Sequence, residues 1–161
     1  MATRIQTRGR LSRPTRNALL TAHIIVSVGL LGDSAGFLAV AIRRAVTTDP
    51  ELAAAALKLL NMFALVFGIP LSFAALITGT IQAIGSGWGL LRYPWVTTKL
   101  LLIVSVILVG AFVLQPALDS PGPGGDAPLI VGSGYDVAAL ALATGLGVFK
   151  PGRPRHTRNR P

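Results

Sequence analysis

The chain has 161 residues, of which 52% are hydrophobic and only 13% are charged. Soluble domains carry about 25% charged residues, so this composition excludes an ordinary soluble domain and indicates a protein surrounded by lipid. The net charge of +9 would suit nucleic acid, but ten of the fifteen basic residues lie in two short tails. Because neither tail contains a Phe, Tyr or Trp residue among its basic residues, we expect no nucleic-acid partner.

The sequence contains no cysteine. Disulfides, thiolate zinc sites, iron–sulfur clusters and covalently attached c-type haem are therefore excluded. A haem held by two histidines would need a second intramembrane histidine, but the one other histidine, His156, lies in the basic tail. We therefore expect no cofactor and no metal site within one chain.

Four apolar stretches are long enough to cross the bilayer, which takes ~20 residues for ~30 Å of hydrocarbon. The predicted spans cover residues 18–42, 63–84, 95–114 and 128–149, with tails at 1–17 and 150–161. The sequence therefore predicts an all-α membrane protein with a bundle of four helices.

Turn and cap residues predict where these helices begin and end. Asp49 is expected to cap a helix whose first residue is Pro50, ahead of the second span. Gln115 and Pro116 are expected to end the third span. The fourth span contains Pro128 and several glycines, so a short or tilted helix is favoured over a re-entrant segment.

The distribution of basic residues predicts the orientation. With both termini in the cytoplasm, twelve Lys and Arg residues lie on the inner side and three on the outer side. Basic residues accumulate on the cytoplasmic side of membrane proteins. We therefore expect an N-in, C-in protein of the plasma membrane, with its tails on anionic lipid head groups. Trp88, Arg92, Tyr93 and Trp95 are expected to anchor the second turn at the membrane interface.

Asp33 is the clearest candidate site, because an ionisable residue within a span is costly and marks a functional hypothesis. It is expected in the outer half of the membrane. At about 100° per residue, it borders a seam of small residues that lets helices approach closely. This predicted packing seam consists of Ala22, Gly29, Gly32 and Gly36. Asp33 either handles protons or cations, or is a structural residue bonded to Asn61 or Gln115.

Three further polar residues are expected at one depth near the cytoplasmic side: His23, Gln82 and Lys99. Such a cluster could relay protons or bind a metal or haem iron, although a lone interfacial histidine is more often a hydrogen-bonded anchor. Because His23 and Asp33 lie at opposite depths of one helix, we expect them in different sites. Pro70 is expected to kink the second span.

Three segments resemble a family of uncharacterised bacterial membrane proteins common in actinobacteria. They are TAHIIVSVGLLG at 21–32, GWGLLRYPWVTTKLLL at 87–102 with the later Gln115-Pro116, and VFKPG at 148–152. That family is distantly similar to the membrane domain of copper-resistance-D-type proteins. The resemblance implies a four-helix membrane bundle in the bacterial inner membrane and no established activity.

No motif of an enzyme is present, so we expect a non-enzymatic accessory or structural membrane component. Its partner could be another membrane protein or a second copy of the chain. One alternative is a small transporter or proton- or cation-handling protein that uses Asp33. A second alternative is a metal- or redox-linked membrane protein.

Overall fold

A computed structural model describes residues 12–85, 93–120 and 125–149, which are helical with no strand among them. Trp88 and Arg92 lie outside these described residues, as do most of the basic tails. The helical segments are α1 (Arg13–Val46), α2 (Pro50–Met62), η1 (Phe63–Gly68), α3 (Ile69–Gly85), α4 (Pro94–Val109), η2 (Gly110–Leu114), α5 (Gln115–Asp119) and α6 (Asp126–Phe149).

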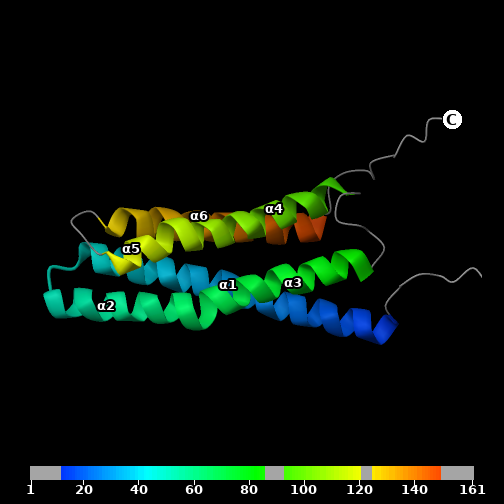
Figure 1. Cartoon of the computed structure of the whole chain (residues 1–161), viewed down its shortest axis with the longest axis horizontal. Helices are drawn as coiled ribbons and strands as arrows, with labels where there is room; N and C mark the ends of the chain where they lie inside the picture. Colours follow the sequence, from blue (N-terminus) through cyan, green and yellow to red (C-terminus); the bar gives the residue numbers. More distant parts are fainter. Residues whose placement is uncertain (1–11, 86–92, 121–124, 150–161) are drawn as a thin grey trace, which may run out of the picture.

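These segments join into four helices that are long and apolar enough to cross a membrane (Figure 1). They are Arg13–Val46, Pro50–Gly85, Pro94–Asp119 and Asp126–Phe149. The predicted all-α bundle of four helices is confirmed. In particular, α6 is one helix of 24 residues and not a re-entrant segment.

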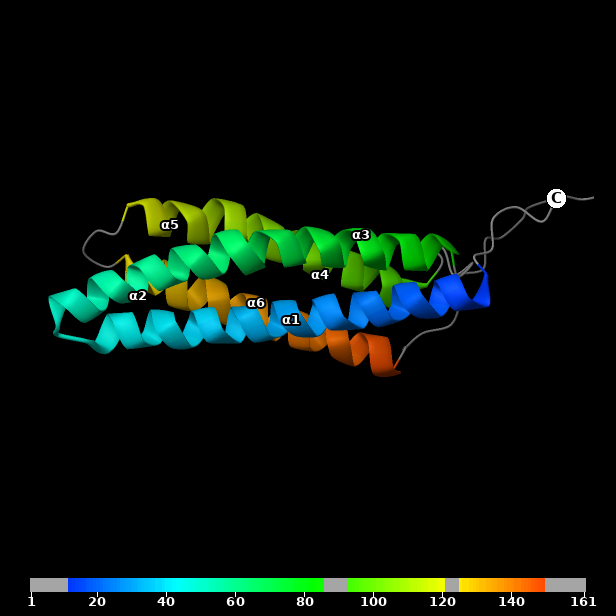
Figure 2. The ribbon, with the colours of Figure 1, turned by 90° about the horizontal axis from the view of Figure 1, so that it is seen from below.

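The four helices form a closed ring in chain order. α1 packs against α3 and α6, and α4 packs against the same two helices from the other side. α1 begins, and α6 ends, at one end of the bundle (Figures 1 and 2). We call this the terminal end. We call the opposite end, where α1 meets α2 and α5 meets α6, the loop end.

Local signals account for the helix starts. The Ser12 hydroxyl accepts a hydrogen bond from the Thr15 N–H and caps α1. The Asp49 carboxylate accepts from the Glu51 and Leu52 N–H groups, so the predicted cap before Pro50 is confirmed. Such caps satisfy N–H groups that the first helical turn leaves without partners.

The predicted end of the third helix at Gln115 and Pro116 is wrong, because the helix continues through both residues to Asp119. A π-helical segment, η2, precedes them, and the Gln115 N–H bonds to the Gly110 carbonyl five residues back. A wider π-helical turn leaves room for a proline ring that would clash with the preceding turn of an α-helix.

The second helix shows the same arrangement at Pro70. The π-helical segment η1 comes directly before Ile69 and Pro70, and the Ile69 N–H bonds to the Ala64 carbonyl. The helix changes direction between α2 and α3, as predicted for Pro70 (Figure 1). Two neighbouring helices thus each carry a π-helical segment followed by a proline.

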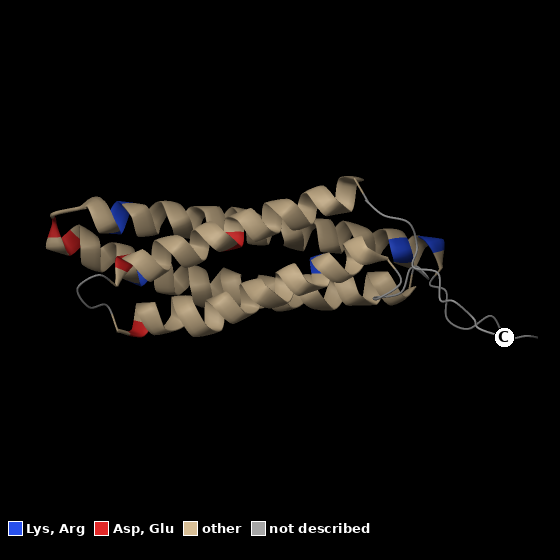
Figure 3. Cartoon of the chain, turned by 90° about the horizontal axis from the view of Figure 1, so that it is seen from above, with Lys and Arg blue, Asp and Glu red and all other residues tan. Residues whose placement is uncertain are grey.

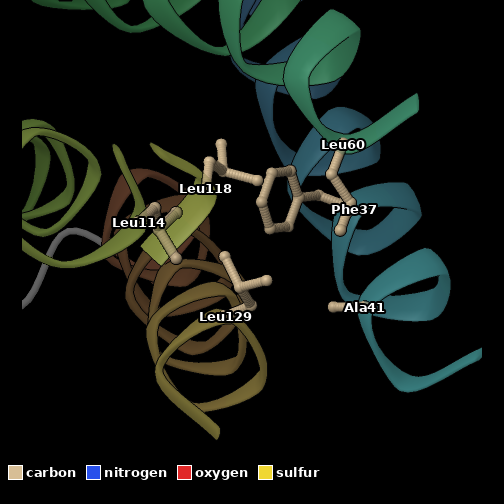
Figure 4. Packing of buried hydrophobic residues seen from close by; sticks show 6 residues of the cluster. All are labelled: Phe37, Ala41, Leu60, Leu114, Leu118 and Leu129. Carbon is tan, nitrogen blue, oxygen red and sulfur yellow. The ribbon is translucent and has the colours of Figure 1, made fainter. Parts of the chain in front are cut away.

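The core consists of three layers of apolar side chains. The loop-end layer contains Phe37, Ala41, Leu60, Leu114, Leu118 and Leu129, and Figure 4 shows Phe37 pointing from α1 toward the other helices. The middle layer contains Leu30, Ala75, Val106, Ala139 and Leu140. The terminal-end layer contains Ala83, Trp95 and Val96.

Candidate functional site

The first candidate site is a cavity of about 390 Å³ lined by two carboxylates, Asp33 of α1 and Asp136 of α6. We call it the acidic cavity. Its other polar lining residues are Ser34, Ser72 and Gln115, and Leu30, Val106, Phe37 and Leu114 contribute apolar walls from the middle and loop-end layers. It therefore lies within the apolar length of the bundle.

Neither carboxylate is fully paired. The side chain of Asp136 is buried, with 5% of its surface exposed, and its Oδ1 atom has no hydrogen-bond partner among the described residues. The Oδ1 atom of Asp33 is buried and unpartnered in the same way. Burying a charged group without a partner is costly, so such groups are rare in structures selected for stability alone.

The predicted partners of Asp33 are wrong. The Asn61 amide donates to the Leu57 carbonyl on its own helix, and the Gln115 amide donates to the Asp119 carboxylate. Each amide thus donates its hydrogen bond to a residue four positions away on its own helix. Neither amide therefore links its helix to Asp33 of α1.

Both π-helical segments border the acidic cavity. Its lining includes Ala64, Leu65 and Gly68 of η1 and Gly110, Ala111 and Leu114 of η2. Because a proline follows each segment and has no N–H, at least one carbonyl in the turn before it lacks its backbone donor. The cavity is therefore bordered by two carboxylates and by two helices that are interrupted by π-helical segments. π-Helical segments occur frequently at functional sites.

Gly68 of η1 lies directly against the carboxylate of Asp33. A Cβ atom placed on Gly68 would lie 3.3 Å from Asp33 Oδ2. Glycine at this position lets the π-helical segment approach the carboxylate without pressing on it.

The second candidate site is a cavity of about 500 Å³ toward the terminal end, which we call the basic cavity. His23, Gln82 and Lys99 all line it, although they come from three different helices. Asp33 does not line it, so His23 and Asp33 lie in different cavities. A Cβ atom on Gly147 would lie 3.0 Å from Lys99 Nζ, which places the ammonium group against α6.

The His23 ring is held by α3. Its Nδ1 atom lies 2.9 Å from Thr78 Oγ1, and that hydroxyl lies 2.6 Å from the Ala74 carbonyl oxygen. Because the hydroxyl donates to the Ala74 carbonyl, its oxygen is left to accept a hydrogen bond from His23 Nδ1. Gly79 provides the space, because a Cβ atom there would lie 3.0 Å from His23 Cε1.

The middle apolar layer separates the two cavities. Leu30 lines both, Val106 lines the acidic cavity, and Ala75 and Leu140 line the basic cavity. The bundle therefore places two polar spaces in succession along its axis with an apolar layer between them.

The predicted seam of small residues is shorter than expected. Cβ atoms on Gly29 and Gly36 would lie 3.5 Å from Leu71 and 3.1 Å from Phe63 of the second helix. Gly32 has no neighbour within 4 Å at that position, and Ala22 is exposed.

The predicted interface anchors are only partly described. Trp95 is buried against Ala83 and Val96, with Tyr93 packed beside it. Trp95 is therefore a core residue of the terminal-end layer. The structure does not describe Trp88 and Arg92.

Sequence reasoning did not identify Asp136 as a site residue, because it stands among glycines in the weakest predicted span. The available signal was its charge within an apolar stretch, the same signal that identified Asp33. In residues 12–85, 93–120 and 125–149, no three His, Cys, Asp or Glu side chains gather in a group suited to a metal ion.

Comparisons with known proteins identify a family but no characterised relative. No curated protein matches the chain, and no solved structure matches it. A family model matches residues 17–119, from the second turn of α1 to the end of α5, with Asp33, His23 and Lys99 but not Asp136. The chain belongs to this family, described as "Predicted integral membrane protein (DUF2269)", and it is an integral membrane protein.

Proposed function

We propose that this protein is a non-enzymatic membrane protein that handles protons or a small cation in its acidic cavity. The observation that carries the proposal is that Asp33 and Asp136 line one cavity and each has a buried oxygen without a partner. Intramembrane carboxylates commonly belong to proton relays and ion pathways. Hydrogen bonds to Asn61 or Gln115 would have favoured a structural role for Asp33, and neither is formed.

The surroundings of the two carboxylates support the same chemistry. Transporters often bind ions near the bilayer midplane, where interrupted helices offer backbone carbonyls. Here η1 and η2 interrupt two helices beside the cavity. Carboxylate, carbonyl and hydroxyl oxygens together suit a proton or a hard cation better than an anion.

The proposal includes location and orientation. The protein lies in the bacterial inner membrane with the terminal end of the bundle in the cytoplasm. The excess of basic residues at that end supports this orientation, with the tails on anionic head groups. The acidic cavity then lies toward the outer side and the basic cavity toward the cytoplasm. The likeness to copper-resistance-D-type membrane domains is proposed as a likeness of fold only.

Ion flux in proteoliposomes tests the proposal. The purified chain is reconstituted with a pH-sensitive dye inside, and proton, sodium and potassium gradients are applied in turn. Asp33→Asn and Asp136→Asn should each abolish the flux that the unmodified protein supports. The matched control is Glu51→Gln, since Glu51 is exposed at the start of α2 and lies outside the cavity. Flux that is unchanged in both cavity variants would overturn the proposal.

A second candidate function is that of an accessory or structural subunit. The observation that favours it is that α2 extends beyond α5 and the start of α6 at the loop end (Figures 1 and 2). Leu59 and Met62 are exposed apolar residues of α2 and could contact a partner. Purification in mild detergent tests it: a larger membrane protein should co-purify with the unmodified chain and be lost on Leu59→Ser. A chain that purifies alone contradicts this role.

A further inference from the structure

The basic cavity contains a cation that the chain itself does not neutralise. All six acidic residues of the sequence lie in the described parts of the structure, and none of them lines this cavity. Asp33 and Asp136 line the acidic cavity, and the others are Asp49, Glu51, Asp119 and Asp126. Figure 3 shows the acidic residues toward the loop end and none at the terminal end of the described helices. Lys99 therefore has no carboxylate side chain within reach.

An unpaired ammonium group at membrane depth is costly, and intramembrane lysines usually pair with an anion or with carbonyl oxygens. By contrast, Arg44 at the loop end forms an ion pair with Asp126. The same bundle thus pairs a basic residue near its end and leaves Lys99 without an acid inside a cavity of about 500 Å³. An anion from outside the chain would supply the missing charge.

The walls of the cavity indicate the kind of anion. Apolar residues form most of the lining, and Ile24, Val28 and Val148 are both lining residues and exposed on the outside of the bundle. The cavity therefore opens sideways, between apolar side chains that face lipid. A hydrated soluble anion would have to pass this apolar rim, whereas a lipid already has its acyl chains there.

We infer that the basic cavity binds one anionic phospholipid, with its phosphate at Lys99 and its acyl chains along the apolar rim. Gln82 adds a neutral amide donor to the same cavity, and the His23 ring, held by Thr78, forms part of its wall. This site lies within the bundle and differs from the contact of the basic tails with head groups. The inference does not depend on the proposed ion-handling function, because it uses the other cavity.

Quenching of tryptophan fluorescence by brominated lipids tests the inference. The chain has two tryptophans, and Trp95 lines the basic cavity, so a Trp88→Phe variant reports from the cavity alone. It is reconstituted in phosphatidylcholine vesicles with increasing fractions of dibrominated phosphatidylglycerol or dibrominated phosphatidylcholine. Both lipids carry a phosphate, but the choline ammonium of phosphatidylcholine cancels its charge. Lys99 should therefore favour the anionic phosphatidylglycerol about tenfold.

Lysine variants in the Trp88→Phe background locate the preference. Lys99→Gln should bring the ratio of the two lipid affinities to about one, and Lys99→Arg should keep the preference because it keeps the charge. Lys58→Gln is the matched control, since Lys58 is exposed on α2, far from this cavity along the bundle. All variants carry the same tails, so lipid binding by the tails is equal in all of them. Circular dichroism verifies that each variant is folded.

Two results would overturn the inference. The first is equal quenching by the two lipids in the Trp88→Phe protein, or a preference that survives in Lys99→Gln. The second comes from inorganic phosphate added to vesicles that contain no anionic lipid. If phosphate changes the Trp95 emission in a Lys99-dependent way while the lipids are not distinguished, the ligand is a free anion and not a lipid.

Discussion

Asp33 of α1 and Asp136 of α6 line the same cavity, and each has a buried Oδ1 atom without a hydrogen-bond partner in the described helices. Two such groups lower the stability of the fold, since apolar residues of similar size would pack there without unpaired oxygens. Residues that are retained at the expense of stability are often functional. Stability and activity should therefore change in opposite directions at these positions.

Asp136→Asn tests this opposition directly. The substitution keeps the size of the side chain and removes the buried carboxylate charge, so it should raise the free energy of unfolding by about 1–3 kcal/mol. Thermal unfolding in mild detergent measures the change, and the same protein should lose ion flux in vesicles. Glu51→Gln, at an exposed site, should change stability by less than about 0.5 kcal/mol. A less stable Asp136→Asn protein would mean that the carboxylate has a stabilising partner.

Gly68→Ala should disturb Asp33 without removing it. The new Cβ atom would lie 3.3 Å from Asp33 Oδ2, so the carboxylate has to move by a few tenths of an ångström. We expect reduced ion flux with the helix content unchanged. The control is Gly110→Ala, because Gly110 also lies in a π-helical segment beside the cavity but has no neighbour within 4 Å of its Cβ position. Equal losses in the two variants would indicate an effect of the π-helical backbone and not of Asp33.

The four spans could be predicted from the sequence because each apolar stretch has the length that the bilayer requires. The cap at Asp49 could be predicted because it depends on neighbours in the sequence. The separation of His23 from Asp33 followed from their distance along one helix. All three depend on spacing within a single helix, which the sequence states directly.

The composition of the acidic cavity could not be predicted in the same way. It depends on how α6 is rotated against α1, and on whether α6 continues through Pro128 and its glycines at all. Whether Gln115 bonds to Asp33 or to Asp119 on its own helix also depends on local geometry. Proline signalled a distortion at residue 70, but not that the distortion would be a π-helical segment beside a cavity.

The ion pair between Arg44 and Asp126 should fasten the end of α1 to the start of α6. The Arg44 side chain is 14% exposed, and its Nε atom is buried without a partner in the described residues. Asp126→Asn should therefore destabilise the protein by about 1–2 kcal/mol, since it leaves a partly buried cation unpaired.

A double-mutant cycle separates the ion pair from the single changes. Arg44→Gln combined with Asp126→Asn should cost less than the sum of the two, with a coupling energy of about 1 kcal/mol. Thermal unfolding at low and high salt measures it, and salt should weaken the coupling. Strictly additive losses would show that the two side chains do not stabilise each other.

The proposed orientation can be measured by single-cysteine labelling, because the chain contains no cysteine of its own. Thr48 is exposed in the connection between α1 and α2, Ser12 caps the start of α1, and Thr157 belongs to the basic C-terminal tail of the sequence. Thr48→Cys should react with a membrane-impermeant maleimide on intact cells. Ser12→Cys and Thr157→Cys should react only after the membrane is permeabilised, because the proposed orientation puts both basic tails in the cytoplasm.

The unmodified chain provides the control for this labelling, since it should not react before or after permeabilisation. Four spans require Ser12 and Thr157 to behave alike, whichever way the bundle is inserted. Labelling of both on intact cells would reverse the proposed orientation, and the basic cavity would then face the outer leaflet. Different behaviour of the two tails would contradict the four-span topology itself, because an even number of crossings returns the chain to the side on which it began.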